Sequence, residues 1–377
     1  MSQDVVANTR PWYGPLEKKR VGQALDGKSS GDGPFCRKVE RRLETMLGVQ
    51  RVLLTTSCTH ALELALLALG VGPGDEVICP SFTFVSTANA ALRVGATPVL
   101  ADIEETTLGL DPRDVELRLT PRTKAIIPVH YAGVAPDMEA LLGLARARGI
   151  RVVEDAAQGL AASWRGRPLG TLGDAGCFSF HETKNLSCGE GGAVAFSDAG
   201  IASRAEIIRE KGTNRSAFLR GEVDKYTWVA EGSSYVLSDV LAALLDAQLE
   251  RIDEIQAERG RVERTYRERL AGWAERAGVR LFTVPPEREA NHHIFWLLFP
   301  TGVARDRAMD ELRARGIQAT FHYVPLHSSP MGATLARQAG ALPVADSVAS
   351  RLLRLPMHPL LTDDEVARVV EAVSSLS

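Results

Sequence analysis

The segment TKAIIPVHYAGVAPDMEALLGLARARGIRVVEDAA, residues 123–157, decides the fold class of this chain. Its composition predicts a strand in 123–133, a helix in 138–149 and a second strand in 150–157. The same alternation occurs upstream, in EVICPS (76–81), TFVSTANAALRVG (83–95) and TPVLAD (97–102). Short apolar strands that alternate with helices favour an α/β fold, with a large, mostly parallel sheet covered by helices on both faces.

The length of 377 residues favours two domains rather than one compact core. We expect an N-terminal arm over residues 1–15, a large domain over 16–250 and a smaller C-terminal α+β domain over 251–377. A single long helix over 238–275 is predicted to join the two domains. The smaller domain should contain strands in VRLFTV (279–284), HHIFWLLFP (292–300) and IQATFHYVP (317–325), and helices in RDRAMDELRARG (305–316) and after TDDEV.

Composition and charge narrow the class of protein. The net charge of -3, without a block of Lys and Arg, argues against nucleic-acid binding. The opening residues MSQDVVANTRPWYG have no apolar core, so we expect no secretory signal. The longest uncharged stretch, 77–92, contains Pro80, Asn89 and several hydroxyls, so we expect no membrane segment. The five cysteines lack metal-ligand spacing and no HExxH pattern occurs. We therefore predict no metal site, and free thiols in a reducing cytoplasm.

Polar residues follow several predicted strands, at the places where open α/β sheets bind ligands. Asp155 ends the strand 150–157, and the turn at residues 57–59 joins the strand RVLLTT to a helix. Ser179 lies in CFSFH, and Lys184 lies in the glycine-rich loop HETKNLSCGEGG. Taken singly, such residues are most often helix caps, solvated charges or core side chains. Their combination indicates a site.

The combination fits what pyridoxal phosphate needs from a protein. Lys184 supplies an amine for an imine bond, and Asp155 supplies an acid that keeps the pyridine nitrogen protonated. The backbone N–H groups of the turn at Cys58 and Thr59 suit the phosphate. Ser179 adds a hydroxyl, and Phe84 in PSFTFVS offers a surface for the ring.

The order of motifs TSCTHAL, PSFTFVST, PVHYAG, VVEDAAQG, CFSFHETKN and GEGG resembles the DegT/StrS family of sugar aminotransferases, over nearly the whole chain. The resemblance implies the type I fold of the pyridoxal-phosphate enzymes, with Lys184 bonded to the cofactor and Asp155 beside the pyridine nitrogen. It also places Gln158 near the phenolic oxygen of the ring. Ser179, Cys58 and Thr59 would contact the phosphate, and Phe84 would stack on the ring.

The resemblance further implies the reaction and the partners. EGSSYVLSD, FHYVPLH and RLLRLPMHPLLT look like the branch that aminates C4 of dTDP-4-oxo-6-deoxy-D-glucose with L-glutamate, through a pyridoxamine phosphate form. Family members are usually homodimers with shared active sites. Many have Gly-Thr at Cys58-Thr59, and Gly-x-Asn-x-Arg where this chain has Ser234 and Val236. Ser234 would then take the place of the Asn that reaches the neighbouring subunit's phosphate.

Other residues are candidates for substrate contacts. Lys211, Arg215 and Lys225 could hold the nucleotide diphosphate, and Tyr323 and His327 could reach the substrate from the smaller domain. His181 is expected to position the loop of Lys184. Three alternatives stay open at this point: a 3-oxo sugar nucleotide aminotransferase, a sugar dehydratase of the same family, and a non-catalytic binding protein. The dehydratase is the weakest, because that branch has histidine at the position of Lys184.

Overall fold

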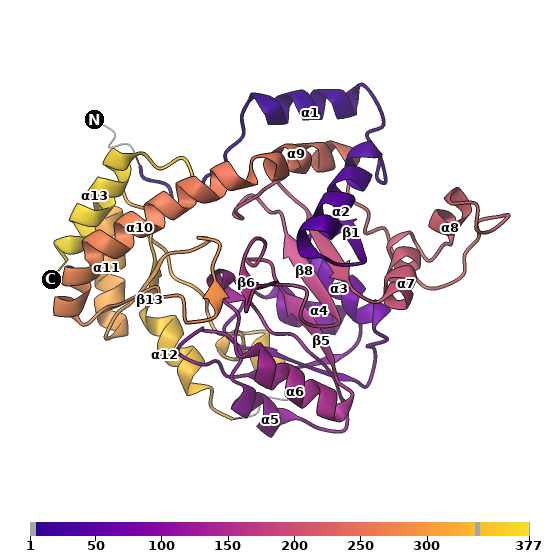
Figure 1. The fold of residues 1–377 in the computed structure, drawn as a ribbon. Helices are drawn as coiled ribbons and strands as arrows, with labels where there is room; N and C mark the ends of the chain where they lie inside the picture. Colours follow the sequence, from indigo (N-terminus) through magenta and orange to yellow (C-terminus); the bar gives the residue numbers. More distant parts are fainter. Residues whose placement is uncertain (1–4, 336–339, 377) are drawn as a thin grey trace.

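A seven-stranded sheet forms the centre of the molecule (Figure 1) in the computed structural model, which describes residues 5–335 and 340–376. Its strands are β1 (Arg51–Thr55), β2 (Glu76–Pro80), β3 (Thr97–Ala101), β4 (Thr123–Ile126), β5 (Arg151–Asp155), β8 (Ala175–Ser179) and β9 (Gly192–Phe196). Their spatial order is β1-β9-β8-β5-β4-β2-β3. The five strands from β8 to β3 are parallel, and only β9 runs antiparallel to both its neighbours. The predicted mostly parallel α/β sheet is therefore confirmed.

Helices cover both faces of this sheet. The helices of this part are α1 (Pro15–Leu25), α2 (Pro34–Leu47), α3 (Cys58–Ala68), α4 (Ser86–Arg93), α5 (Pro112–Arg118), α6 (Met138–Arg148), α7 (Ala199–Arg209), α8 (Arg215–Leu219) and α9 (Asp239–Glu250), of which α8 lies away from the sheet. Successive strand residues point to opposite faces. In β1, Val52 and Leu54 pack in the same core cluster as α2 and α9, whereas Leu53 joins the cluster that contains α3. Burial on both faces explains why the strands read as nearly continuous apolar runs.

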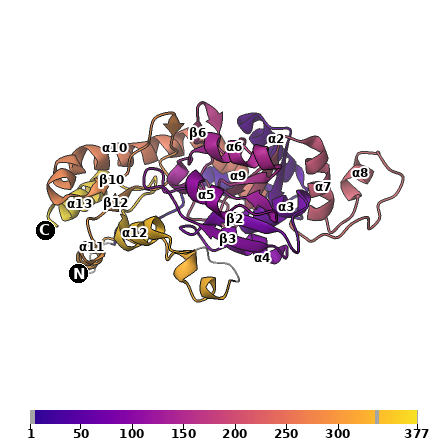
Figure 2. The same ribbon diagram turned by 90° about the horizontal axis from the view of Figure 1, so that it is seen from below.

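The C-terminal part is built around a smaller antiparallel sheet of β10 (Arg280–Leu281), β12 (Trp296–Leu298) and β13 (Leu352–Arg354). Its helices are α10 (Ile252–Ala277), α11 (Gly302–Ala314), α12 (Pro343–Arg351) and α13 (Asp363–Ser374). In Figures 1 and 2 these elements lie together at one end of the molecule. A further small sheet joins β11 (Arg288–Glu289) to β6 (Ser163–Trp164) and β7 (Arg167–Pro168), and so links this part to the large one.

Two expectations for local structure are wrong. The helix predicted over 238–275 is broken at Arg251, which has φ -103° and ψ 14°. The Arg251 guanidinium binds Glu17 at 2.9 Å and lies 4.3 Å from the centre of the Trp12 ring, so tertiary contacts with the N-terminal segment hold the break. We propose this break as the boundary between the two domains.

The segment 317–325, predicted as a strand, makes only isolated bridges, Val6 with Ile317 and Thr320 with Arg354. It turns inward after Thr320 and brings His322 and Tyr323 to a cavity. The N-terminal arm pairs with the same segment, so Asn8 and Thr9 also reach that cavity. Within the described ranges, no helix is both long and apolar enough to cross a membrane.

Candidate active site

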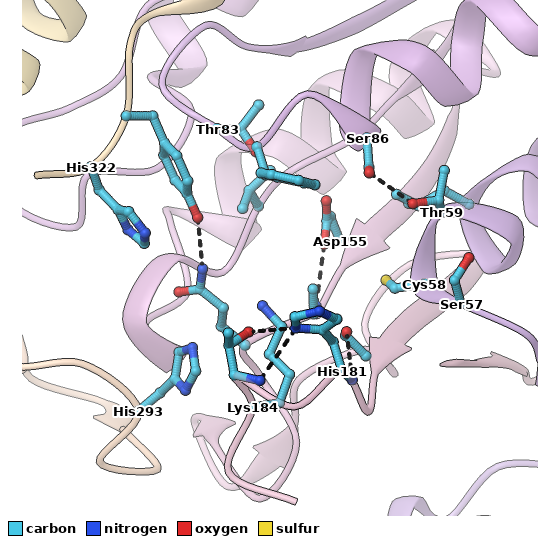
Figure 3. A pocket seen from close by; sticks show the side chains of 18 of the residues that line it. Ser57, Cys58, Thr59, Thr83, Ser86, Asp155, His181, Lys184, His293 and His322 are labelled. Atoms are coloured by element: carbon cyan, nitrogen blue, oxygen red, sulfur yellow. Dashed lines mark hydrogen bonds between the residues drawn. The ribbon is translucent and has the colours of Figure 1, made fainter. Parts of the chain in front are cut away.

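A cavity of about 520 Å³ opens beside the carboxyl end of β5, where an open α/β sheet is expected to bind ligands. Its walls come from the start of α3, the loop before α4, the loop after β8 and three segments of the C-terminal part. Figure 3 shows Asp155 and Lys184 between two sides of this cavity, with Ser57, Cys58 and Thr59 on one side and His322 on the other.

Lys184 lies in the loop between β8 and β9. The loop is closed on itself, since Glu182 and Cys188 donate backbone hydrogen bonds to Gly189 and Phe180 and the Lys184 N–H donates to the His181 carbonyl. Burial lowers the pKa of the Lys184 ammonium, and the Arg354 cation lowers it in the same direction, against opposing effects of Cys58 and Asp155. A lowered pKa leaves more of the amine unprotonated, which is the form that bonds to a carbonyl.

Asp155 is the last residue of β5 and is buried. Its carboxylate accepts hydrogen bonds from the Thr87 hydroxyl at 2.8 Å and from the Ala157 N–H at 3.2 Å. Burial raises the pKa of this carboxyl group, while the bonds from Thr87 and Ala157 and the charge of Lys184 lower it. A buried carboxylate in this setting is stabilised by a cationic partner placed in the cavity.

The turn at the start of α3 is shaped to hold an anion. The Ser57 side chain caps the helix by accepting from the His60 N–H at 3.2 Å, so the N–H groups of Cys58 and Thr59 come before the first helical hydrogen bonds. The backbone of Gly192 passes directly behind the turn, because a Cβ there would lie 2.3 Å from the Ser57 carbonyl carbon. The Thr59 hydroxyl also bonds Ser86 at 2.7 Å.

Aromatic and amide groups form the remaining walls. Phe84 and Tyr323 line the cavity with their ring centres 6.5 Å apart, and Phe84 is 58% exposed. Gln158 is fixed at both ends of its amide. Its oxygen accepts from the Ala132 N–H at 2.7 Å, and its nitrogen donates to the Tyr323 hydroxyl at 3.1 Å. Ser179 lies beside the Lys184 loop and accepts from the His181 N–H at 3.4 Å.

Comparison with known proteins shows the family of the chain. Residues 13–374 match the DegT/DnrJ/EryC1/StrS aminotransferase family. The chain belongs to this family. It is 34% identical over 374 residues to the spore coat polysaccharide biosynthesis protein SpsC of Bacillus subtilis, covering 97% of this chain and 95% of that protein. It is 36% identical over 352 residues to GDP-perosamine synthase of Caulobacter vibrioides, covering 92% and 91%.

A solved structure agrees in fold. The present structure superposes with a TM-score of 0.91 on the pyridoxamine-phosphate form of Spr1654 from Streptococcus pneumoniae, which is described as a putative sugar aminotransferase. The two share 27% identity, with 98% of each chain covered. This chain is therefore a pyridoxal-phosphate-dependent sugar aminotransferase of the type I fold.

The residues of the cavity fit that cofactor. An amine of lowered pKa, a buried carboxylate and a helix start with free N–H groups lie around one cavity with an aromatic side chain. The amine can form the imine bond, and the carboxylate can face the ring nitrogen. The N–H groups can bind the phosphate, and the aromatic side chain can cover the ring face. We propose that Lys184, Asp155, Cys58, Thr59, Phe84, Gln158 and Ser179 hold the cofactor, as the sequence predicts. Among residues 5–335 and 340–376, no cluster of three or more His, Cys, Asp and Glu side chains could hold a metal ion.

Five predicted residues do not line this chain's cavity. Lys211 and Arg215 each bind Glu210 at 2.9 Å, and Lys225 and Ser234 are exposed on the segment between α7 and α9. His327 bonds the Ser81 hydroxyl at 2.7 Å and Asp346 at 3.2 Å. Of the two candidates in the segment FHYVPLH, only Tyr323 reaches the cavity.

Several cavity residues were not singled out from the sequence. Those with polar side chains include Asn8, Thr9, Thr83, Ser86, His293, His322 and Arg354. Arg354 carries the one recognisable signal, since it is a charged residue within the apolar run LLRLP. Thr83 and Ser86 flank Phe84 in the chain, whereas Asn8, His293 and His322 come from segments that only the tertiary fold brings to the cavity.

Thr87 is a positioning residue for Asp155, and it gives a prediction about pH. Its hydroxyl lowers the pKa of Asp155, so the Thr87→Val variant should have a higher Asp155 pKa. As the pH is lowered, the turnover of Thr87→Val should therefore begin to fall at a higher pH than that of the wild type. At neutral pH its turnover should be about 10-fold lower than that of the wild type. The Thr87→Ser variant keeps the hydroxyl and should behave like the wild type. A pH profile of kcat for Thr87→Val that overlays the wild-type profile would contradict this role.

Proposed function

We propose that this enzyme transfers the amino group of L-glutamate to C4 of dTDP-4-oxo-6-deoxy-D-glucose, giving a dTDP-4-amino-4,6-dideoxy sugar and 2-oxoglutarate. The observation that carries the transamination is the meeting of Lys184, Asp155 and the α3 turn in one cavity. The choice of sugar is supported by the motifs EGSSYVLSD and FHYVPLH.

The residues of the cavity can perform the steps of such a transfer. Bound pyridoxal phosphate supplies an electron sink for the carbon that loses its proton. Lys184 would hold the cofactor through an imine bond, and once the amino group of the donor has replaced it in that bond, its free Nζ would act as the base that takes the proton from the Cα of the donor and then as the acid that gives it back. Asp155 holds a proton on the ring nitrogen. Because burial lowers the pKa of Lys184, more of its amine is unprotonated and able to take up the proton from the Cα of the donor.

The nucleotide and the position of the keto group decide the substrate. The name of the relative GDP-perosamine synthase refers to a GDP-linked sugar, so the base needs a direct test. The holoenzyme should be supplied with L-glutamate and, in parallel, with dTDP-4-oxo, GDP-4-oxo and dTDP-3-oxo 6-deoxy sugars. We expect the highest kcat/KM with the dTDP-4-oxo sugar. A preference for the 3-oxo sugar would favour the alternative aminotransferase, and cofactor binding without reaction with L-glutamate would favour a non-catalytic binding protein.

We also propose a cytoplasmic homodimer with shared active sites. All five cysteines are buried and unpaired, which suits a reducing compartment. The segment between α7 and α9, which includes α8, stands away from the body of the molecule (Figures 1 and 2). It exposes Tyr226, Trp228 and Val229 to solvent. Lys211, Arg215, Lys225 and Ser234 lie on or beside this segment, and in the dimer they would face the partner's cofactor phosphate and nucleotide.

The dimer gives a prediction with a matched control. Trp228 is 77% exposed, and its replacement by serine should weaken dimerisation by roughly 10- to 100-fold if the ring is buried by the partner. Leu117 on α5 is 84% exposed, and Leu117→Ser should leave the dimer unchanged. Sedimentation velocity over a range of concentrations measures both. A monomeric wild type, or a Trp228→Ser variant with wild-type association, would contradict the proposed interface.

A further inference from the structure

His293 is a buried imidazole whose orientation is fixed by the residue that follows Lys184. It lies in the segment before β12, and its Nδ1 is 2.7 Å from Asn185 Oδ1. The Asn185 amide nitrogen donates to the carbonyl oxygen of Asn291 at 2.6 Å and to Gln256 Oε1 at 3.1 Å. Because a backbone carbonyl only accepts, the amide oxygen of Asn185 must face His293. Nδ1 is therefore the donor, and Nε2 of the neutral ring keeps a lone pair.

The surroundings keep this ring neutral. Burial lowers the pKa of His293 well below its usual value. The positive charges of Lys184, Arg259 and Arg354 lower this pKa further. The Arg259 guanidinium also donates to the His293 carbonyl oxygen at 2.7 Å, which fixes the backbone of the residue. His293 thus presents an uncharged acceptor atom.

This acceptor shares its surroundings with the amine of Lys184. Both residues line the large cavity, and both line a neighbouring cavity of about 20 Å³, which has room for one water molecule. Figure 3 shows the two residues at the same end of the large cavity, away from Ser57 and Thr59. Among residues 5–335 and 340–376, neither His293 Nε2 nor Lys184 Nζ has a hydrogen-bond partner. The donor and the acceptor are therefore both available.

We propose that His293 Nε2 accepts a hydrogen bond from Lys184 Nζ, directly or through one water molecule, whenever this amine is not bonded to the cofactor. This inference rests on the proposed role of Lys184 as the carrier of a proton. A free amine on a flexible side chain has many rotamers, and an acceptor at a fixed place restricts them. His293 is a positioning residue, because its strongly favoured neutral form does not take the proton itself.

The other acceptor close to the amine has a different task. The charge of Asp155 also acts on Lys184, but its carboxylate is proposed to face the ring nitrogen of the bound cofactor. An uncharged acceptor has a further advantage. It orients the amine without holding it strongly in the protonated form, which could not take a proton from the donor.

Two substitutions separate the two nitrogen atoms of the ring. The amide of glutamine can place an acceptor near the position of Nε2, and the amide of asparagine can place a donor near that of Nδ1. His293→Asn should keep the bond to Asn185 and lose the one to Lys184, so we expect both half-reactions to slow by about 10- to 100-fold. His293→Gln should stay within about 5-fold of the wild type.

The yellow cofactor band of the holoenzyme measures both halves, since L-glutamate bleaches it and the keto sugar nucleotide restores it. The half-saturating concentrations in His293→Asn should stay within about 2-fold of the wild type, because His293 holds neither substrate. With L-glutamate deuterated at Cα, the isotope effect on bleaching should be larger in His293→Asn, because proton transfer has become the slow step. The control is His292→Gln, whose ring bonds Glu263 at 2.8 Å outside the cavity and which should match the wild type.

Nitrogen NMR of protein labelled in its histidine rings gives a readout that does not depend on activity. The signals of His293 are those that disappear in His293→Gln. We expect a neutral ring with its proton on Nδ1 between about pH 6 and pH 8. The Nε2 signal should move when pyridoxamine phosphate replaces pyridoxal phosphate, because Lys184 is then free. It should not move in this way in Lys184→Ala.

Three results would overturn the inference. The first is a wild-type rate in His293→Asn. The second is a loss in His293→Gln as large as that in His293→Asn or larger, which would make support of Asn185 the role of the ring. The third is a charged ring or a proton on Nε2. If L-glutamate does not bleach the wild type, the proposed transamination fails, while the NMR comparison of the two cofactor forms still tests the contact with Lys184.

Discussion

Replacing Lys184 by alanine should give a protein that neither shows the yellow cofactor band nor transfers an amino group. The variant loses the amine that bonds the cofactor and the group that moves the proton between Cα and the cofactor. Loss of general acid–base catalysis alone reduces turnover by about 10²- to 10⁴-fold, and loss of the covalent bond adds to this. We therefore expect kcat below detection in a coupled assay for 2-oxoglutarate.

Two comparisons make this prediction specific. Lys124 on β4 is exposed, and Lys124→Ala should keep the colour and the activity of the wild type. A small primary amine added to Lys184→Ala should restore a little turnover, because it can take the place of the missing proton carrier. A yellow band in Lys184→Ala that L-glutamate still bleaches would show that another amine holds the cofactor.

The large domain was predictable because its sheet is buried on both faces. Apolar runs such as those at Val77–Cys79 and Val152–Val153 have one stable placement, between two layers of helices. The small domain was less predictable. The segment that begins at Ile317 has the apolar composition of a strand. Its backbone forms only isolated bridges, with Val6 of the N-terminal arm and with β13, and the chain then turns into the cavity.

The same reasoning explains which site residues the sequence indicated. Asp155 and the turn at Cys58 are fixed by local rules, since each follows a strand end at the carboxyl edge of the sheet. Arg354 and Asn8 enter the cavity from opposite ends of the chain, and nothing local marks them as neighbours. Ser234 is proposed to act in the partner's site, so its role depends on a second copy of the chain.

Replacing Asp155 by alanine should leave a coloured protein with little activity. Lys184 is intact, so it can still bond the cofactor, but the ring nitrogen loses the carboxylate that keeps it protonated. Removing a preorganised charge of this kind costs about 10²- to 10³-fold in turnover. Absorbance titration measures cofactor binding, and single-turnover bleaching by L-glutamate measures the proton-transfer half. Near-normal bleaching in Asp155→Ala would contradict the role of Asp155 as partner of the ring nitrogen.

The Asp155→Asn variant separates charge from geometry. In Asp155 the Thr87 hydroxyl donates to Oδ2 at 2.8 Å and the Ala157 N–H donates to Oδ1 at 3.2 Å. Asparagine keeps the shape and both contacts, because its amide oxygen can accept from Ala157 while its amide nitrogen donates to the Thr87 hydroxyl, but it carries no negative charge. If charge dominates, Asp155→Asn should be nearly as slow as Asp155→Ala, and Thr87→Val, which keeps the carboxylate, should be much faster than both. If position dominates, Asp155→Asn should resemble Thr87→Val. The burial that raises the pKa of Asp155 favours the first result, because a carboxylate in such a site interacts most strongly with the cation it faces.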